Sequence, residues 1–124
     1  MGKMPRTVEY EDPARLELIK ELKESASKQD AAIWRTLADE LSRSGKNRRE
    51  VNMWKLSRYT KDGETVVVPG KVLGDGELDH KINIAAYKFS EKAKRKIEKT
   101  GGKMMSINEL IKKNPKGSNL RLIG

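Results

Sequence analysis

The spacing of the apolar residues changes near residue 51, and this change limits the kind of fold that the chain can adopt. Before it, apolar residues recur every three or four positions, which is the period of a helix that buries one face. After it, the short run TVVV (65–68) and the alternating segment KINIAAYKF (81–89) have the character of strands. The chain is therefore predicted to have an α/β fold in which helices come first.

Two helices are predicted within residues 13–43, joined as a helical hairpin, and residues 1–12 are assigned to an N-terminal extension. Asp12 is a suitable N-cap, and Pro13 suits the first helical position, where its missing N–H is not needed. A second start is predicted at Asp30. Each helix has one apolar stripe: Leu18, Ile19, Leu22 and Ala26 in the first, and Ile33, Trp34, Leu37, Ala38 and Leu41 in the second.

The segment SGKNRRE (44–50) has no apolar residue and is predicted to form a basic loop between the hairpin and an α/β core at 51–124. Residues 51–59 are ambiguous between strand and helix, and we favour a strand. The strand at 65–68 is expected to close at Pro69 and Gly70, because proline lacks the N–H that a sheet uses. Together, residues 13–124 are predicted to form a single domain.

The last third of the chain carries clear helix signals. Ser90 is a suitable N-cap for a helix that ends at Gly101, with Ala93 and Ile97 as its apolar anchors. The sequence SINE (106–109) has the pattern of a capping box and predicts a second, shorter helix. A last short strand is predicted at 120–123. The many lysines from Lys92 to Lys99, in the helix that follows Ser90, fit either a solvated surface or a binding face.

Positive charge is concentrated after residue 40. The formal net charge is +9; residues 1–40 hold 7 Lys and Arg against 9 Asp and Glu, whereas residues 41–124 hold 20 against 9. Such an excess suits a polyanionic partner, because each phosphate that the protein neutralises releases condensed counterions. Solubility alone is the alternative explanation.

Other features of the composition exclude several classes of protein. The chain has no cysteine, which excludes disulfides and thiolate metal sites. No apolar run approaches the roughly 20 residues of a membrane span, and the polar start MGKMPRTVEYED lacks the apolar segment of a signal peptide. We therefore expect a soluble, intracellular protein.

The segment VVVPGKVLGDGELDH (66–80) raises the question of a metal or phosphate site, because its carboxylates and a histidine stand beside three glycines. A calcium loop that starts at Asp75 would need glycine where His80 stands and glutamate where Ala86 stands. A zinc site would need partners for the only histidine. A P-loop would need Ser or Thr after Lys71, and a dinucleotide fingerprint would need glycine at position 79. No metal or cofactor is expected.

Catalysis by the same segment is a further possibility. Asp79 and His80 could form a dyad, with Ser57 or Ser90 as the nucleophile. Adjacent residues of a strand point to opposite faces, however, so we do not expect Asp79 to orient His80. We interpret the segment as a structural turn in which Asp75 can bond to its own backbone. Glu77 and Asp79 can repel misplaced phosphates or pair with nearby Lys and Arg side chains. A small hydrolase that uses Asp79 and His80 is kept as an alternative function.

The segments VNMWKLSRYTKDGETVVVPGKVLGDGELDHKINIAAYKFSEKAKRKIEKTGGK (51–103) and PKGSNLRLIG (115–124) carry a resemblance to a known family. From about Pro13 to Gly124, the chain resembles the archaeal large-subunit ribosomal protein L-eighteen-e family. Its middle part is also similar to the bacterial large-subunit ribosomal protein fifteen family. Trp54 departs from the pattern, because the family usually has a smaller residue there. An archaeal origin is expected, since eukaryotic relatives carry a longer basic tail.

The resemblance implies a structural constituent of the large ribosomal subunit, located in the cytoplasm, with no enzymatic role and no small-molecule substrate. It implies large-subunit ribosomal RNA and neighbouring ribosomal proteins as partners, rather than a membrane or a second copy of the chain. It also implies a fold in which strand–strand–helix units wind into an irregular superhelix. A DNA-architectural or chromatin-type protein is the alternative that the charge would equally allow.

The residues expected to bind RNA are of two kinds. RNA phosphates are met mainly by Lys and Arg side chains presented by surface loops on a rigid scaffold. The candidates for this role are Arg43, Lys46, Arg48, Arg49, Arg58, Lys61, Lys71, Lys116 and Arg121. Trp54, Tyr59 and His80 are candidates to stack on bases or to hydrogen-bond to sugars, with packing in the core as the alternative for each.

Overall fold

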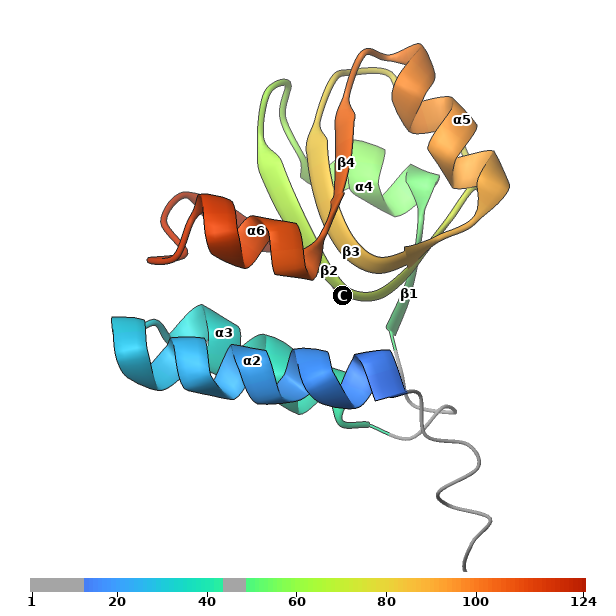
Figure 1. The fold of residues 1–124 in the computed structure, drawn as a ribbon. Coiled ribbons are helices and arrows are strands. Elements are labelled where there is room, and N and C mark those ends of the chain that lie inside the picture. Colours follow the sequence, from blue (N-terminus) through green and yellow to red (C-terminus); the bar gives the residue numbers. More distant parts are fainter. Residues whose placement is uncertain (1–12, 44–48) are drawn as a thin grey trace, which may run out of the picture.

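The computed structural model describes residues 13–43 and 49–124. The described elements are α2 (Pro13–Gln29), α3 (Ala32–Leu41), β1 (Arg49–Asn52), α4 (Met53–Tyr59), β2 (Thr65–Leu73), β3 (Asn83–Phe89), α5 (Glu91–Lys99), β4 (Lys103–Ser106), α6 (Ile107–Lys113) and β5 (Leu120–Leu122) (Figure 1). None of the helices in these two ranges is long and apolar enough to span a membrane. The predicted extension 1–12, with its cap Asp12, and the loop residues Lys46 and Arg48 lie outside the described residues.

The strands form one five-stranded sheet in which every paired neighbour is parallel. The order is β1–β2–β3–β4, and β5 also pairs with β2. β5 pairs with the first part of β2, from Thr65↔Leu120 to Val67↔Leu122, whereas β1 pairs with its last part, from Arg49↔Gly70 to Asn52↔Leu73. Because β3 occupies the opposite edge of β2, β1 and β5 follow one another along the same edge.

Both faces of the sheet are covered, as parallel sheets require. The connections from β1 to β4, which contain α4, the segment 74–82 and α5, pack on one face through Leu56, Leu78 and Ile97. The return from β4 to β5 runs through α6 on the other face, next to α2 and α3 (Figure 1). This return runs across the sheet in the opposite direction and on the opposite face from the earlier connections. Because both are reversed, it has the same handedness as they have, in agreement with the strong preference of parallel sheets for one handedness of crossover.

The alternation predicted for residues 81–89 is confirmed. Ile82, Ile84 and Ala86 belong to the core on the α4 and α5 side, whereas Ala85 belongs to the core beneath α2, α3 and α6. β2 divides its valines in the same way, with Val67 facing opposite to its neighbours. The two strands thus supply side chains to both cores, which explains why so few apolar residues suffice.

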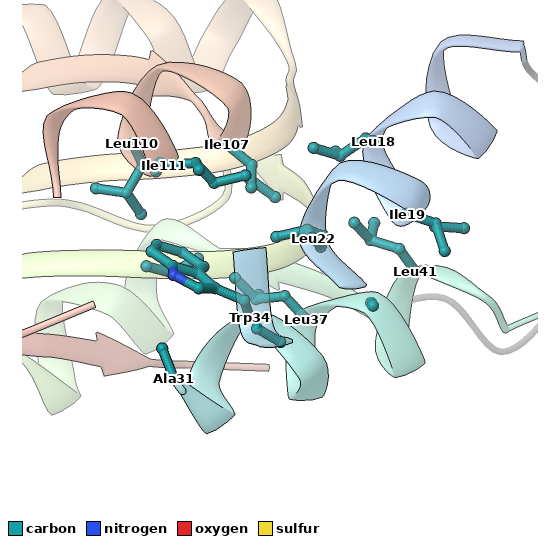
Figure 2. Packing of buried hydrophobic residues seen from close by; sticks show 14 residues of the cluster. Leu18, Ile19, Leu22, Ala31, Trp34, Leu37, Leu41, Ile107, Leu110 and Ile111 are labelled. Carbon is teal, nitrogen blue, oxygen red and sulfur yellow. The ribbon is translucent and has the colours of Figure 1, made fainter. Parts of the chain in front are cut away.

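The helices α2 and α3 pack against each other and against α6. The two predicted apolar stripes meet there, as Figure 2 shows for Leu22, Trp34 and Leu37, with Ile107 and Leu110 of α6 above them. Arg15 at the start of α2 is buried, and its Nη1 donates a 2.6 Å hydrogen bond to the carbonyl oxygen of Leu41. The Arg15 guanidinium group thus supplies a donor to a carbonyl oxygen in the last turn of α3, and its positive charge suits that end of the helix.

The preference for a strand at residues 51–59 is wrong for most of that segment. Only residues 51 and 52 are extended, as the second half of β1, and Met53–Tyr59 form α4. The buried side chains of α4 are Met53 and Leu56, which are three residues apart and so share a helical face. Residues 49 and 50, assigned to the basic loop, form the first half of β1 because they pair with β2.

Three smaller expectations also need correction. Pro69 and Gly70 do not close the strand, because β2 continues to Leu73 with an irregular register between Val68 and Lys71. Asp30 is not the N-cap of α3; it adopts a positive φ of 51°, which Asp tolerates, and Ala31 takes the cap position. The edge strand β4 was not predicted.

The capping signals are confirmed. The Ser90 side chain accepts a 3.1 Å hydrogen bond from the backbone N–H of Ala93, and Ser106 and Glu109 form both bonds of a capping box. The strand predicted at the end of the chain is β5. The α/β class is confirmed, whereas the superhelix implied by the resemblance stays a prediction.

Candidate nucleic-acid interface

Two of the predicted arginines are brought together at the junction of α3 and β1. Oε1 of Glu40 lies 3.2 Å from Nε of Arg43 and 3.0 Å from Nε of Arg49. The two arginine side chains remain 44% and 42% exposed. One carboxylate therefore holds two guanidinium groups near each other at the surface, with more positive than negative charge between them.

The C-terminal segment connects this junction to α4. A Cβ atom built on Gly124 would lie 3.3 Å from Cγ of Arg49, so Gly124 lies against the aliphatic part of that side chain. On its other side, the carbonyl oxygen of Gly124 accepts a 2.7 Å hydrogen bond from Nζ of Lys55. Lys55 belongs to α4, which the sheet positions beside β5.

A second group of cations surrounds Tyr59 at the end of α4. The guanidinium carbon of Arg58 lies 5.9 Å from the centroid of the Tyr59 ring. Nη1 of Arg121 in β5 donates a 3.2 Å hydrogen bond to the Tyr59 carbonyl oxygen, and its Nε lies 3.2 Å from Glu64. The backbone N–H of Lys61 donates to the same Glu64 carboxylate over 2.6 Å.

The pKa of Glu64 is lowered from its usual value, first by the hydrogen bond from the Lys61 N–H and then by the charge of Arg121. The carboxylate is therefore ionised at neutral pH and orients Arg121 rather than competing for protons. The contacts join one continuous surface from the end of α3 to β5, which we call the basic strip. Its members are Arg43, Arg49, Lys55, Arg58, Lys61 and Arg121.

His80 and its neighbours form a separate hydrogen-bonded group at the end of α4. His80 Nδ1 lies 2.7 Å from Asp79 Oδ1, so the expectation that Asp79 would not orient His80 is wrong. The reason is that these residues belong to the irregular connection 74–82 and not to a strand, so their side chains need not point apart. The Ser57 hydroxyl donates to the same Asp79 oxygen over 3.0 Å.

The geometry of this group differs from that of a catalytic triad. His80 Nε2 lies 2.7 Å from Oγ1 of Thr60, which is only 8% exposed and donates its own hydrogen to the Leu56 carbonyl oxygen. The exposed hydroxyl, Ser57, bonds to the carboxylate and not to the imidazole. The pKa of Asp79 is lowered first by its bond to His80 and then by the bond from Ser57. The group ties the connection to α4.

The other two carboxylates of this turn, Asp75 and Glu77, pair with lysines of α5, which confirms the pairing predicted for Glu77. Asp75 lies 3.5 Å from Nζ of Lys92, and Glu77 lies 3.4 Å from Nζ of Lys96. Within residues 13–43 and 49–124, no three His, Asp or Glu side chains are grouped so that they could hold a metal ion. The turn therefore neutralises part of the cationic helix.

Comparison with known proteins identifies the family. The profile of the family described as "Ribosomal protein 60S L18 and 50S L18e" matches residues 3–124. The chain belongs to this family. It is 47% identical over 120 residues to the large ribosomal subunit protein eL18 of Methanoregula boonei, covering 97% of this chain and 99% of that protein. The eL18 proteins of Methanothermobacter thermautotrophicus and Methanococcus maripaludis are 39% and 45% identical, covering 97% and 90% of this chain and 99% and 93% of their own lengths.

Three of the predicted residues, Lys71, Lys116 and Trp54, lie outside the basic strip. Lys71 is exposed in β2, between Glu50 of β1 and Lys88 of β3 in register, and not in a turn. Lys116 is exposed in the turn after α6. Trp54 is 51% exposed in the first turn of α4, where its backbone N–H donates a 3.0 Å hydrogen bond to the backbone carbonyl oxygen of Asp75.

Lys55 is the member of the basic strip that sequence reasoning missed. The strand predicted for residues 51–59 gives Lys55 and Tyr59 no special relationship to the end of the chain, whereas α4 does. The helical spacing of four residues between Lys55 and Tyr59 would have placed both on one face.

Proposed function

We propose that the chain is a structural constituent of the large ribosomal subunit that binds large-subunit ribosomal RNA, in the cytoplasm. The observation that carries the proposal is the match, over nearly its whole length, to proteins named as large ribosomal subunit protein eL18. The alignments cover 99% of each of these two relatives, so nearly all of each relative has a counterpart in this chain.

The basic strip supports RNA phosphates as the ligands. Arginine guanidinium groups present a planar set of donors that suits phosphate oxygens, and the two whose Nε atoms bond to Glu40 are held near each other. The strip is built on β1, β5 and α4, which the parallel sheet fixes relative to one another. A positioned row of cations is what recognition of a folded RNA backbone requires.

The finer parts of the proposal concern further contacts and partners. Lys46, Arg48, Lys71 and Lys116 are proposed as additional phosphate contacts, and neighbouring ribosomal proteins as partners. The His80 group is proposed to be structural and not catalytic. For the chain as a whole, we propose no cofactor, no small-molecule substrate and no homo-oligomer. The buried position of Thr60 and the bonding of Ser57 to Asp79 support this assignment.

A competition experiment tests the proposal. The purified full chain is mixed with labelled large-subunit ribosomal RNA, and binding is measured in about 0.15 M salt while unlabelled ribosomal RNA or double-stranded DNA of equal phosphate content is added. Ribosomal RNA is expected to displace the label far better than DNA. Equal displacement by DNA would favour a DNA-architectural protein instead, and absence of binding to the ribosomal RNA would reject both.

A further inference from the structure

A hollow of about 260 Å³ lies between α4 and β5. Its lining residues are Lys55, Tyr59, Arg121, Leu122, Ile123 and Gly124. Pockets for drug-sized ligands have volumes of roughly 300–1,000 Å³, so this hollow suits about one flat ring system. It lies within the basic strip and opens to the surface.

Two large apolar side chains are incompletely covered at this hollow. Tyr59 is 50% exposed and Leu122 is 37% exposed, and they come from elements more than 60 residues apart in the chain. Among the described residues, the other large apolar side chains with comparable exposure are Leu16 and Trp54, which do not line it. Tyr59 and Leu122 together offer an apolar surface on which a flat ring can pack.

The walls of the hollow are held in place before any ligand arrives. Arg121 is fixed by its bonds to Glu64 and to the Tyr59 carbonyl oxygen, and Lys55 by its bond to Gly124. Arg58 lies over the Tyr59 ring, 5.9 Å from its centroid. A ligand would therefore not have to order these side chains, which lowers the cost of binding.

The charge around the hollow selects the ligand. Lys55 and Arg121 line an apolar and aromatic floor, Arg58 lies over the Tyr59 ring, and Glu64 is the carboxylate bonded to Arg121. A neutral apolar peptide would leave this positive charge unmatched. A nucleotide matches both parts, because its base is flat and apolar on its face and its phosphate is anionic.

We propose that this hollow binds one unpaired base of RNA, which stacks on Tyr59 and contacts Leu122 while its flanking phosphates meet Lys55 and Arg121. The inference rests on the proposed function and makes it specific: the basic strip recognises a nucleotide that has left its helix, and not only a duplex backbone. Bases inside a duplex are stacked on each other and cannot offer a face to Tyr59.

The test uses the full chain and an eight-nucleotide RNA, oligo(A) with one central 2-aminopurine, either single-stranded or paired with oligo(U). The fluorescence of the 2-aminopurine reports stacking on an aromatic ring, and its titration gives the affinity. The variants are Tyr59→Leu, which removes the ring, and Tyr59→Phe, which keeps it. Trp54→Leu is the matched comparison, because Trp54 is the other exposed aromatic of the same helix that was predicted to stack, and it lies outside the hollow, so the inference assigns the base to Tyr59 instead.

The wild-type chain, Tyr59→Phe and Trp54→Leu are expected to bind the single strand with a change in fluorescence. Tyr59→Leu is expected to bind it roughly 5- to 150-fold more weakly, the range found when one stacking aromatic is removed, and to lose the fluorescence change. Its affinity for the duplex should be unaltered. Thermal unfolding of each variant verifies that it is folded, which the exposure of both side chains favours.

Unaltered binding of the single strand by Tyr59→Leu would overturn the inference and leave the hollow to a protein segment. An equal loss with Trp54→Leu would overturn it as well, because stacking would then not be specific to the hollow. In both cases the wild-type chain still binds RNA, so the proposed function stands. If the wild-type chain binds neither the single strand, nor the duplex, nor ribosomal RNA, both the inference and the proposed function are overturned.

Discussion

The indole N–H of Trp34 in α3 donates a 2.7 Å hydrogen bond to the carbonyl oxygen of Pro115, which lies 81 residues further along the chain. The same turn approaches α3 through Gly117, where an added Cβ would lie 2.5 Å from a methyl carbon of Ile33. Trp34 is fully buried in the core shared by α2, α3 and α6. The first helices are thereby fastened to the segment that leads into β5, and so to the wall of the hollow.

Replacing Trp34 by Phe should destabilise the chain by about 2–3 kcal/mol. The variant loses the hydrogen bond to Pro115 and leaves part of the indole volume empty. Urea unfolding followed by circular dichroism measures the free energy. Trp54→Phe is the matched control and should stay within about 0.5 kcal/mol, because that ring is half exposed. Equal effects of the two substitutions would contradict the role assigned to the Trp34 contact.

Gly70→Ala should cost about 3 kcal/mol or more. An added Cβ would lie 2.0 Å from the carbonyl oxygen of Arg49, so β1 would have to move away from β2. Gly63→Ala is the comparison, since Gly63 has a φ of +86° but nothing within 4 Å of the added atom. Its cost should be about 1–2 kcal/mol from backbone strain alone. Chemical denaturation compares the two, and a smaller cost at Gly70 would argue against close packing of β1.

Acidification should remove the stabilisation supplied by the capping box of α6. The pKa of Glu109 is held below its usual value of 4.5, first by the backbone N–H of Ser106 and then by the Ser106 side chain. The folded state therefore releases this proton more readily, and the stabilisation is present above pH 4.5 and lost as the pH falls through the lower folded pKa. Glu109→Gln keeps the hydrogen-bonding pattern but does not titrate.

The Tm of the wild-type chain should thus exceed that of Glu109→Gln at pH 7, and the difference should shrink as the pH falls below 4.5. Thermal unfolding of both proteins from pH 7 to pH 3 measures it, and the other carboxylates cancel in the comparison. A difference that stays constant over this range would show that the charge of Glu109 does not contribute.

The double variant Arg43→Ala with Arg49→Ala should bind ribosomal RNA more weakly, and its affinity should depend less on salt. If about six phosphates are neutralised, log K should fall with log salt at a slope of about −4 to −5, and each lost contact should reduce the slope by about 0.7–0.9. Lys20→Ala with Lys23→Ala removes the same charge from exposed positions of α2 and serves as the control. Equal slopes for the two double variants would reject the junction of α3 and β1 as a contact.

The predictions from sequence were most successful where the signal is local. The serine caps at Ser90 and Ser106 depend on atoms within three residues, so their side chains specify the helix starts directly. The alternation in 81–89 and the two helical stripes were also correct, because burial of one face imposes its period on neighbouring residues. The prediction for residues 51–59 was wrong because the short strand β1 is followed at once by α4. Too few residues are left in each element for the period of a strand or of a helix to be recognised.

The sequence by itself therefore determined the α/β class, the capped helices, the family and the excess of positive charge. Only the tertiary structure decided which cations act together. Arg49, Lys55 and Arg121 become neighbours because β1 and β5 follow one another along the same edge of β2 and α4 packs beside them. The physical reason is that hydrogen bonding between strands joins residues far apart in the chain, and no local pattern of side chains records that pairing.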